Sequence, residues 1–203
     1  MGIEAVVFDL DGVLVDSIEA WYSMQKVSFK KYSGREISFE DWKTNFWGKD
    51  STEMYRILGL PPERIAEAIK WQSEELMNSI DKIKPVATAL IVLESVKDLG
   101  AKIGILSNNK KEFITAVLKH FGFYKFFDSI VGDEVEPKPS PKGLLKSVEN
   151  LGAKKENSVF VGDTETDLKA GNAAGIKTII IGKNVKSLDE VPAFINWNEV
   201  KYF

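Results

Sequence analysis

The sequence predicts a doubly wound α/β fold built on a parallel sheet. Apolar runs at 6–8, 102–106, 157–161 and 177–181 are nearly continuous, and a shorter run lies at 129–131. Near-continuous apolar strands are typical of a parallel sheet that is covered on both faces. Segments with helical periodicity separate most of these runs, and an alternation of strands and helices favours the doubly wound arrangement.

Four segments of this core have the apolar spacing of amphipathic helices. They cover residues 87–99, 111–121, 144–151 and 164–174. A glycine follows each segment, at the position where a left-handed residue often ends a helix: Gly100, Gly122, Gly152 and Gly175.

Residues 16–81 interrupt the alternation, because they contain helical patterns and no strand. The expected helices cover 17–32, 39–46, 52–58 and 62–78, and four of the five tryptophans lie in this stretch. We therefore expect a core domain formed by 1–15 and 82–203, with a small helical cap domain of residues 16–81 inserted after the first strand.

The composition excludes several classes of protein. The 203 residues carry a formal net charge of -3 and contain no cysteine. This charge does not favour binding to nucleic acid or to an anionic membrane, and the lack of cysteine excludes disulfides and zinc–sulfur sites. The sequence shows no secretory signal and no run long enough to span a bilayer, so we expect a cytoplasmic protein. It does not distinguish a monomer from a homodimer.

Polar residues follow the predicted strands. Asp9 and Asp11 come directly after the first strand, Ser107 and Asn108 follow the second, and Asp163 follows 157–161. Ligands of such sheets bind beyond the carboxyl ends of the strands, so these side chains should converge there. Burying two carboxylates at the end of a strand costs free energy unless their negative charge is neutralised. A divalent cation that binds oxygen ligands is the usual neutralising partner.

These motifs resemble those of the haloacid dehalogenase superfamily. The chain contains, in the order typical of that family, Asp9-Leu10-Asp11-Gly12, Ser107, Lys138 within 136–141, and Gly162-Asp163-Thr164-Glu165-Thr166-Asp167. The resemblance covers 1–15 and 82–185, and the cap is similar to the small helical cap of the phosphoglycolate phosphatase and β-phosphoglucomutase branch. It implies a Rossmann-like core.

The resemblance also implies roles for individual residues. Asp9 would attack phosphorus, and Asp11 would protonate the leaving alcohol and then activate water. Lys138 would neutralise the nucleophile and the transferring phosphoryl oxygens. Mg²⁺ would be held by Asp9, the backbone carbonyl of Asp11, and Asp163.

Ser107 and the backbone N–H of Asn108 would form a phosphate cradle before a helix. Asp167 has two possible roles, since it lies one turn past Asp163: it orients metal-bound waters or pairs with Lys138. In the cap, Trp47 and Lys49 belong to a loop that resembles the substrate-contacting loop of related enzymes. The alternative for these two residues is a core aromatic beside a solvated lysine.

The resulting hypothesis is an enzyme, a Mg²⁺-dependent phosphatase that hydrolyses a small phosphorylated metabolite, such as a sugar phosphate or phosphoglycolate, through an aspartyl-phosphate. One alternative is a phosphomutase of the β-phosphoglucomutase type, although Trp21 stands about where those mutases typically carry a histidine. Another is a non-catalytic binding protein on the same scaffold, although such proteins usually lose a motif acid and none is lost here.

Overall fold

A computed structural model describes residues 2–196, and the chain forms two compact units. The first unit comprises Met1–Asp16 and Pro85–Phe203, and the second comprises Ser17–Lys84. Two short strands, β2 (Val15–Asp16) and β3 (Lys84–Pro85), pair at the points where the chain passes between the units. No helix among the described residues is long and apolar enough to cross a membrane.

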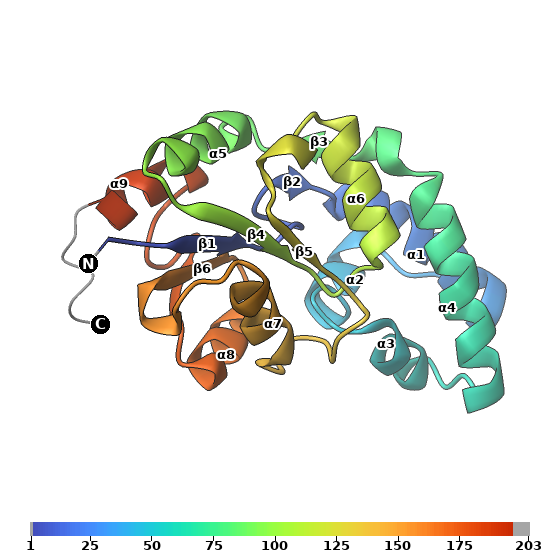
Figure 1. Ribbon diagram of the computed structural model, residues 1–203. Helices are drawn as coiled ribbons and strands as arrows, with labels where there is room; N and C mark the ends of the chain where they lie inside the picture. The colour runs from blue at the N-terminus through green and yellow to red at the C-terminus, as the bar shows by residue number, and fades with distance from the viewer. Residues whose placement is uncertain (1, 197–203) are drawn as a thin grey trace. The chain divides into compact units, whose positions relative to one another are not determined.

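The first unit contains a five-stranded sheet in the order β5-β4-β1-β6-β7 (Figure 1). All neighbouring strands in it are parallel. The strands are β1 (Ala5–Phe8), β4 (Lys102–Leu106), β5 (Ser129–Val131), β6 (Ser158–Gly162) and β7 (Lys177–Ile180). The predicted α/β fold with a parallel sheet is therefore confirmed.

The register of the strands brings their carboxyl ends to one edge of the sheet. Phe8 of β1 is the Cα partner of Ile105 in β4 and of Val161 in β6. The chain continues this ladder beyond the strand, because the Asp9 N–H donates to the Val161 carbonyl at 2.8 Å. The residues that follow β1, β4 and β6 therefore start from the same edge.

Helices cover both faces of this sheet. Figure 1 shows α7 and α8 on one face and α5 and α9 on the other. The helices of the unit are α5 (Ala89–Asp98), α6 (Lys111–His120), α7 (Lys142–Asn150), α8 (Glu165–Ala174) and α9 (Val191–Asn196). A Cβ on Gly143 would lie 2.7 Å from the Leu106 side chain, so glycine allows α7 to pack closely on β4.

The second unit consists mainly of helices around an aromatic core. Its helices are α1 (Ile18–Ser33), α2 (Phe39–Asn45), α3 (Ser51–Ile57) and α4 (Pro62–Met77), followed by a short 3₁₀ helix at Ile80–Lys82. Trp42, Phe29 and Tyr55 are fully buried, and Trp21 and Trp71 pack against this core. The tryptophans of this stretch therefore stabilise the helical unit itself.

Candidate active site

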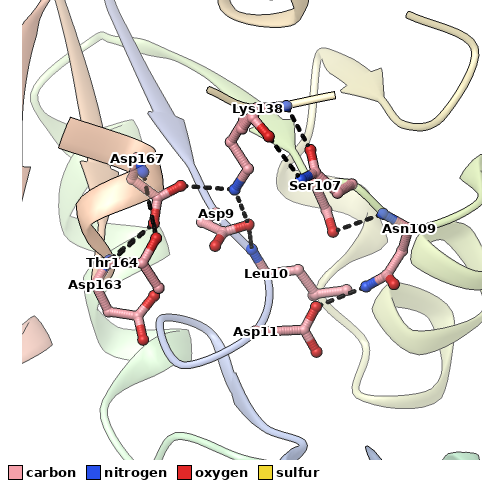
Figure 2. Close-up of polar contacts among 10 residues, drawn as sticks. Asp9, Leu10, Asp11, Ser107, Asn109, Lys138, Asp163, Thr164 and Asp167 are labelled. Carbon is pink, nitrogen blue, oxygen red and sulfur yellow. Dashed lines mark hydrogen bonds and ion pairs between the residues drawn. The ribbon is translucent and has the colours of Figure 1, made fainter. Parts of the chain in front are cut away.

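A buried lysine joins two carboxylates at the carboxyl end of the sheet. Lys138 Nζ lies 2.8 Å from Asp9 Oδ1 and 2.7 Å from Asp167 Oδ1 (Figure 2). Asp9 follows β1, Asp167 lies in the first turn of α8, and Lys138 lies in the loop between β5 and α7. Their exposed fractions are 6% for Asp9, 0% for Asp167 and 9% for Lys138. Of the two roles considered for Asp167, the structure therefore shows the ion pair with Lys138.

Burial and neighbouring charges shift the pKa values of Asp9 and Lys138 strongly. Burial raises the pKa of Asp9 well above its ordinary value, and Lys138 opposes that shift. Burial alone would lower the pKa of Lys138, but the charges of Asp9 and Asp167 outweigh it and raise this pKa. The lysine is therefore a cation at neutral pH, and it lies between the two buried carboxyl groups of Asp9 and Asp167.

Asp163 adds a third carboxylate to this cluster. Oxygen atoms of Asp9, Asp163 and Asp167 lie within 4.8 Å of one another. Asp163 Oδ1 is buried and has no hydrogen-bond partner within the described part of the chain. Burial, and then the charge of Asp167, raise the pKa of Asp163 to about 7. Three carboxylates, one with an unpartnered buried oxygen, are a donor set that suits a hard divalent cation.

The first turn of α8 holds Asp167 in place. Thr164 Oγ1 accepts from the Asp167 N–H at 3.2 Å, and Asp167 Oδ2 accepts from the Thr164 N–H at 3.0 Å. This reciprocal pair is a capping box, and it leaves Oδ1 of Asp167 to face Lys138. Thr164 was not predicted as a site residue from the sequence, although a threonine three residues before an acid at a helix start is the recognisable signal.

Gly12 makes room for Asp163. Gly12 has φ +79°, and a Cβ at this position would lie only 2.1 Å from Asp163 Oδ2. We expect Gly12→Ala to lower the free energy of unfolding by more than the strained backbone alone costs, because Asp163 must also move away from the cluster. Chemical unfolding of the purified variant measures this loss.

Gly100→Ala is the matched control for this prediction. Gly100 has φ +78°, and nothing lies within 4 Å of the position that a Cβ would occupy, so only the backbone cost of about 1 kcal/mol applies there. Equal losses in the two variants would contradict the close contact between Gly12 and Asp163.

The loop between β4 and α6 carries Ser107, Asn108 and Asn109. Ser107 is buried, and its Oγ accepts from the Asn109 N–H at 3.2 Å. The Asn108 side chain contacts the main chain of Lys138: its Oδ1 accepts from the Lys138 N–H at 2.8 Å, and its Nδ2 donates to the Lys138 carbonyl at 3.2 Å. This side-chain contact was not predicted from the sequence, and it fixes the backbone from which Lys138 extends.

Asp11 lies on the other side of Asp9 from this lysine loop and contacts Asn109. Asn109 Nδ2 donates to Asp11 Oδ2 at 2.6 Å (Figure 2). Asp11 is partly buried. Asn109 was not predicted as a site residue from the sequence, where the only signal is a third polar residue directly after the strand.

Trp47 and Lys49 belong to the Ser17–Lys84 unit. The ring centroid of Trp47 lies 5.2 Å from that of Trp42, in the aromatic core of the unit. Lys49 Nζ pairs with Glu53 Oε1 at 2.9 Å, and less than half of each side chain is exposed. These contacts of Trp47 and Lys49 lie within the unit itself.

Comparison with known proteins identifies the family. Residues 6–181 match the model of the haloacid dehalogenase-like hydrolases. Over 197 residues the chain is 32% identical to pyrophosphatase PpaX of Halalkalibacterium halodurans, covering 96% of this chain and 90% of that protein. It is 30% identical to a phosphoglycolate phosphatase of Aquifex aeolicus, covering 95% and 91%. The chain therefore belongs to the haloacid dehalogenase-like hydrolase family, and the predicted enzyme class, a hydrolase, is confirmed.

Solved structures share the fold. A predicted phosphatase from Clostridium acetobutylicum has a TM-score of 0.86 at 22% identity, covering 97% of this chain and all of that one (100%). β-Phosphoglucomutase from Clostridium difficile has a TM-score of 0.81 at 22% identity, covering 98% and 99%. At this identity the likeness establishes the fold alone.

Proposed function

We propose that the protein is a Mg²⁺-dependent phosphatase that hydrolyses small phosphorylated compounds through an aspartyl-phosphate on Asp9. The observation that carries this proposal is the buried contact of Asp9 with Lys138, next to the carboxylates of Asp163 and Asp167. A carboxylate held beside one cation and facing a cluster of metal-binding oxygens is suited to attack an anionic phosphoryl group.

In the first step, a carboxylate oxygen of Asp9 forms a bond to phosphorus while the bond from phosphorus to the leaving oxygen breaks. Lys138 offsets the negative charge of Asp9 as the phosphoryl group approaches, and it stabilises the charge on the phosphoryl oxygens. Asp11 gives its proton to the leaving oxygen. The N–H of Asn108 and the hydroxyl of Ser107, in the loop that leads from β4 to α6, are proposed to hold the phosphoryl oxygens.

In the second step, Asp11 takes a proton from water, and the oxygen of that water forms a bond to phosphorus. The bond between phosphorus and Asp9 breaks, which releases phosphate and restores the free carboxylate. Each proton that Asp11 donates is regained from water, so the residue returns to its starting state.

The metal proposal rests on the oxygen donors of this site. Asp9, the backbone carbonyl of Asp11, and Asp163 are proposed to hold Mg²⁺, and the unpartnered Oδ1 of Asp163 supports this choice. When bound, the ion would supply positive charge that offsets the carboxylates and the phosphoryl oxygens. Asp167 is proposed to hold Lys138 in position beside these ligands, because its carboxylate contacts both Lys138 and the start of α8.

The relatives support a choice of first substrates to test. Their names point to pyrophosphate and phosphoglycolate as the first compounds to test.

We propose that the Ser17–Lys84 unit acts as a cap that selects the leaving group, with Trp47 and Lys49 as substrate-contacting residues. We also propose that the enzyme works in the cytoplasm.

A phosphate-release screen tests the proposed function. The purified protein is expected to release phosphate from a narrow group within a panel of pyrophosphate, phosphoglycolate, sugar phosphates and nucleotides. Release should require Mg²⁺ and stop with EDTA, and re-addition of excess Mg²⁺ should restore it. Folded protein that is silent across the panel with Mg²⁺, or equally active in EDTA, would contradict the proposal.

A further inference from the structure

We infer that Asn109 is a positioning residue that holds the Asp11 side chain in the orientation needed for proton transfer. The inference rests on the proposed function, in which Asp11 serves as acid and then as base. Its basis is the hydrogen bond from Asn109 Nδ2 to Asp11 Oδ2, at 2.6 Å, which joins the end of β4 to the end of β1 (Figure 2).

Asn109 is itself fixed by its main chain. Its N–H donates to Ser107 Oγ at 3.2 Å, and its carbonyl accepts from the Asp133 N–H at 3.0 Å. Gly132 packs directly against it, because a Cβ on Gly132 would lie 2.7 Å from the Asn109 carbonyl oxygen. The amide is therefore presented to Asp11 from a fixed backbone position.

The main chain of Asp11 is fixed separately. The Gly12 N–H donates to the Val15 carbonyl at 2.8 Å, and the Val15 N–H donates to the Leu10 carbonyl at 3.1 Å. These bonds close a tight loop around Asp11 but leave its side-chain torsions to be set by other contacts. The bond from Asn109 restrains those torsions.

The bond also selects between the two carboxylate oxygens. Because Asp11 Oδ2 accepts the amide hydrogen, a proton carried by Asp11 is directed to Oδ1. The acid would then present its proton from one defined atom. Small misplacements of a catalytic group cost large factors in rate, so loss of this restraint should slow the step that needs the proton.

The dependence of the rate on the leaving group separates this role from a purely structural one. Nitrophenolate leaves phosphorus without help from an acid, whereas the more basic phenolate needs a proton. We expect Asn109→Ala to lower kcat/KM for phenyl phosphate by about 30-fold and to change kcat/KM for p-nitrophenyl phosphate much less. Asp11→Asn, which removes the acid, is the reference and should show the same selectivity.

Two further variants complete the test. Asn109→Leu keeps the approximate size of the side chain and removes the donor without adding a charge, so it should show the same selective loss, and it serves if the alanine variant does not fold. Lys110→Ala is the matched control, because this exposed residue follows Asn109 in the same loop. It should change kcat/KM for both esters by the same factor.

Equal losses on the two esters in the Asn109 variants of an active enzyme would overturn the inference and leave the proposed function standing. Wild-type protein that hydrolyses neither ester, nor any compound of the panel, would overturn both.

Discussion

Asp9→Asn is expected to abolish phosphate release, with a loss of about 10⁴-fold or more. A neutral amide is a poor nucleophile and cannot form the acyl phosphate that the proposed reaction requires. Phosphate release by the purified variant, measured with saturating Mg²⁺, gives this loss directly.

The fold should tolerate the same change. Lys138 keeps its contact with Asp167 at 2.7 Å, so no buried cation is left unpaired. Burial raises the pKa of Asp9, which means that the buried carboxylate is itself costly, and a neutral amide removes that cost. The thermal midpoint should therefore be equal to or above that of the wild type.

Asp133→Asn is the matched control for this variant. Asp133 is an exposed aspartate that follows β5 at the same end of the sheet. Its replacement should leave phosphate release unchanged. An Asp9→Asn enzyme with a rate within about tenfold of the wild type would remove Asp9 as the nucleophile.

Lys138→Met is expected to damage both activity and stability. It leaves the buried carboxylates of Asp9 and Asp167 without their cation, and breaking a buried ion pair in this way costs about 3–5 kcal/mol. Phosphate release should fall by at least about 10²-fold, because the charge on the phosphoryl oxygens loses its stabilising partner. Urea unfolding and phosphate release measure the two effects.

The stability loss in this variant should depend on pH. Burial, with the charges of Asp167 and Asp11, already holds the pKa of Asp9 above its unfolded value, and Lys138 opposes this shift. A carboxyl whose folded pKa is raised favours the folded state when it is protonated, and this contribution is lost as the pH rises through the folded pKa. The deficit relative to the wild type should therefore shrink as the pH falls toward about 4, the ordinary range of a carboxyl.

Lys142→Met is the matched control for Lys138→Met. Lys142 also forms an ion pair, with Glu136 at 2.6 Å, but both side chains are more than half exposed. Exposed ion pairs contribute little to stability, so this variant should unfold like the wild type. Similar losses in the two variants would contradict the buried-charge explanation.

The sequence was sufficient to predict the fold and the convergence of the main acids. Near-continuous apolar runs indicated a parallel sheet, and in such a sheet residues that follow the strands share one edge. Asp9, Lys138 and Asp167 indeed meet there, and Asp163 joins them. The order β5-β4-β1-β6-β7 could not be read from the pattern, because periodicity within a strand does not name its neighbours.

The side-chain contacts of the β4–α6 loop were not predictable in the same way. Asn109 and Asp11 are separated by 98 residues, and Asn108 and Lys138 by 30. Which amide reaches which group depends on loop conformation and rotamers, and neither leaves a local pattern in the sequence. The capping box of Thr164 and Asp167 is different, since its signal lies within four consecutive residues.

The stereochemistry at phosphorus tests the proposed aspartyl-phosphate most directly. A phosphorothioate ester that is a substrate of the enzyme, made chiral at phosphorus with two oxygen isotopes, would be hydrolysed in water that carries the third isotope, and the configuration of the released thiophosphate would be determined. Attack by Asp9 and then by water are two in-line displacements, each of which inverts phosphorus, so the proposed mechanism predicts net retention. Net inversion would mean that water attacks the substrate directly, and it would contradict an aspartyl-phosphate on Asp9.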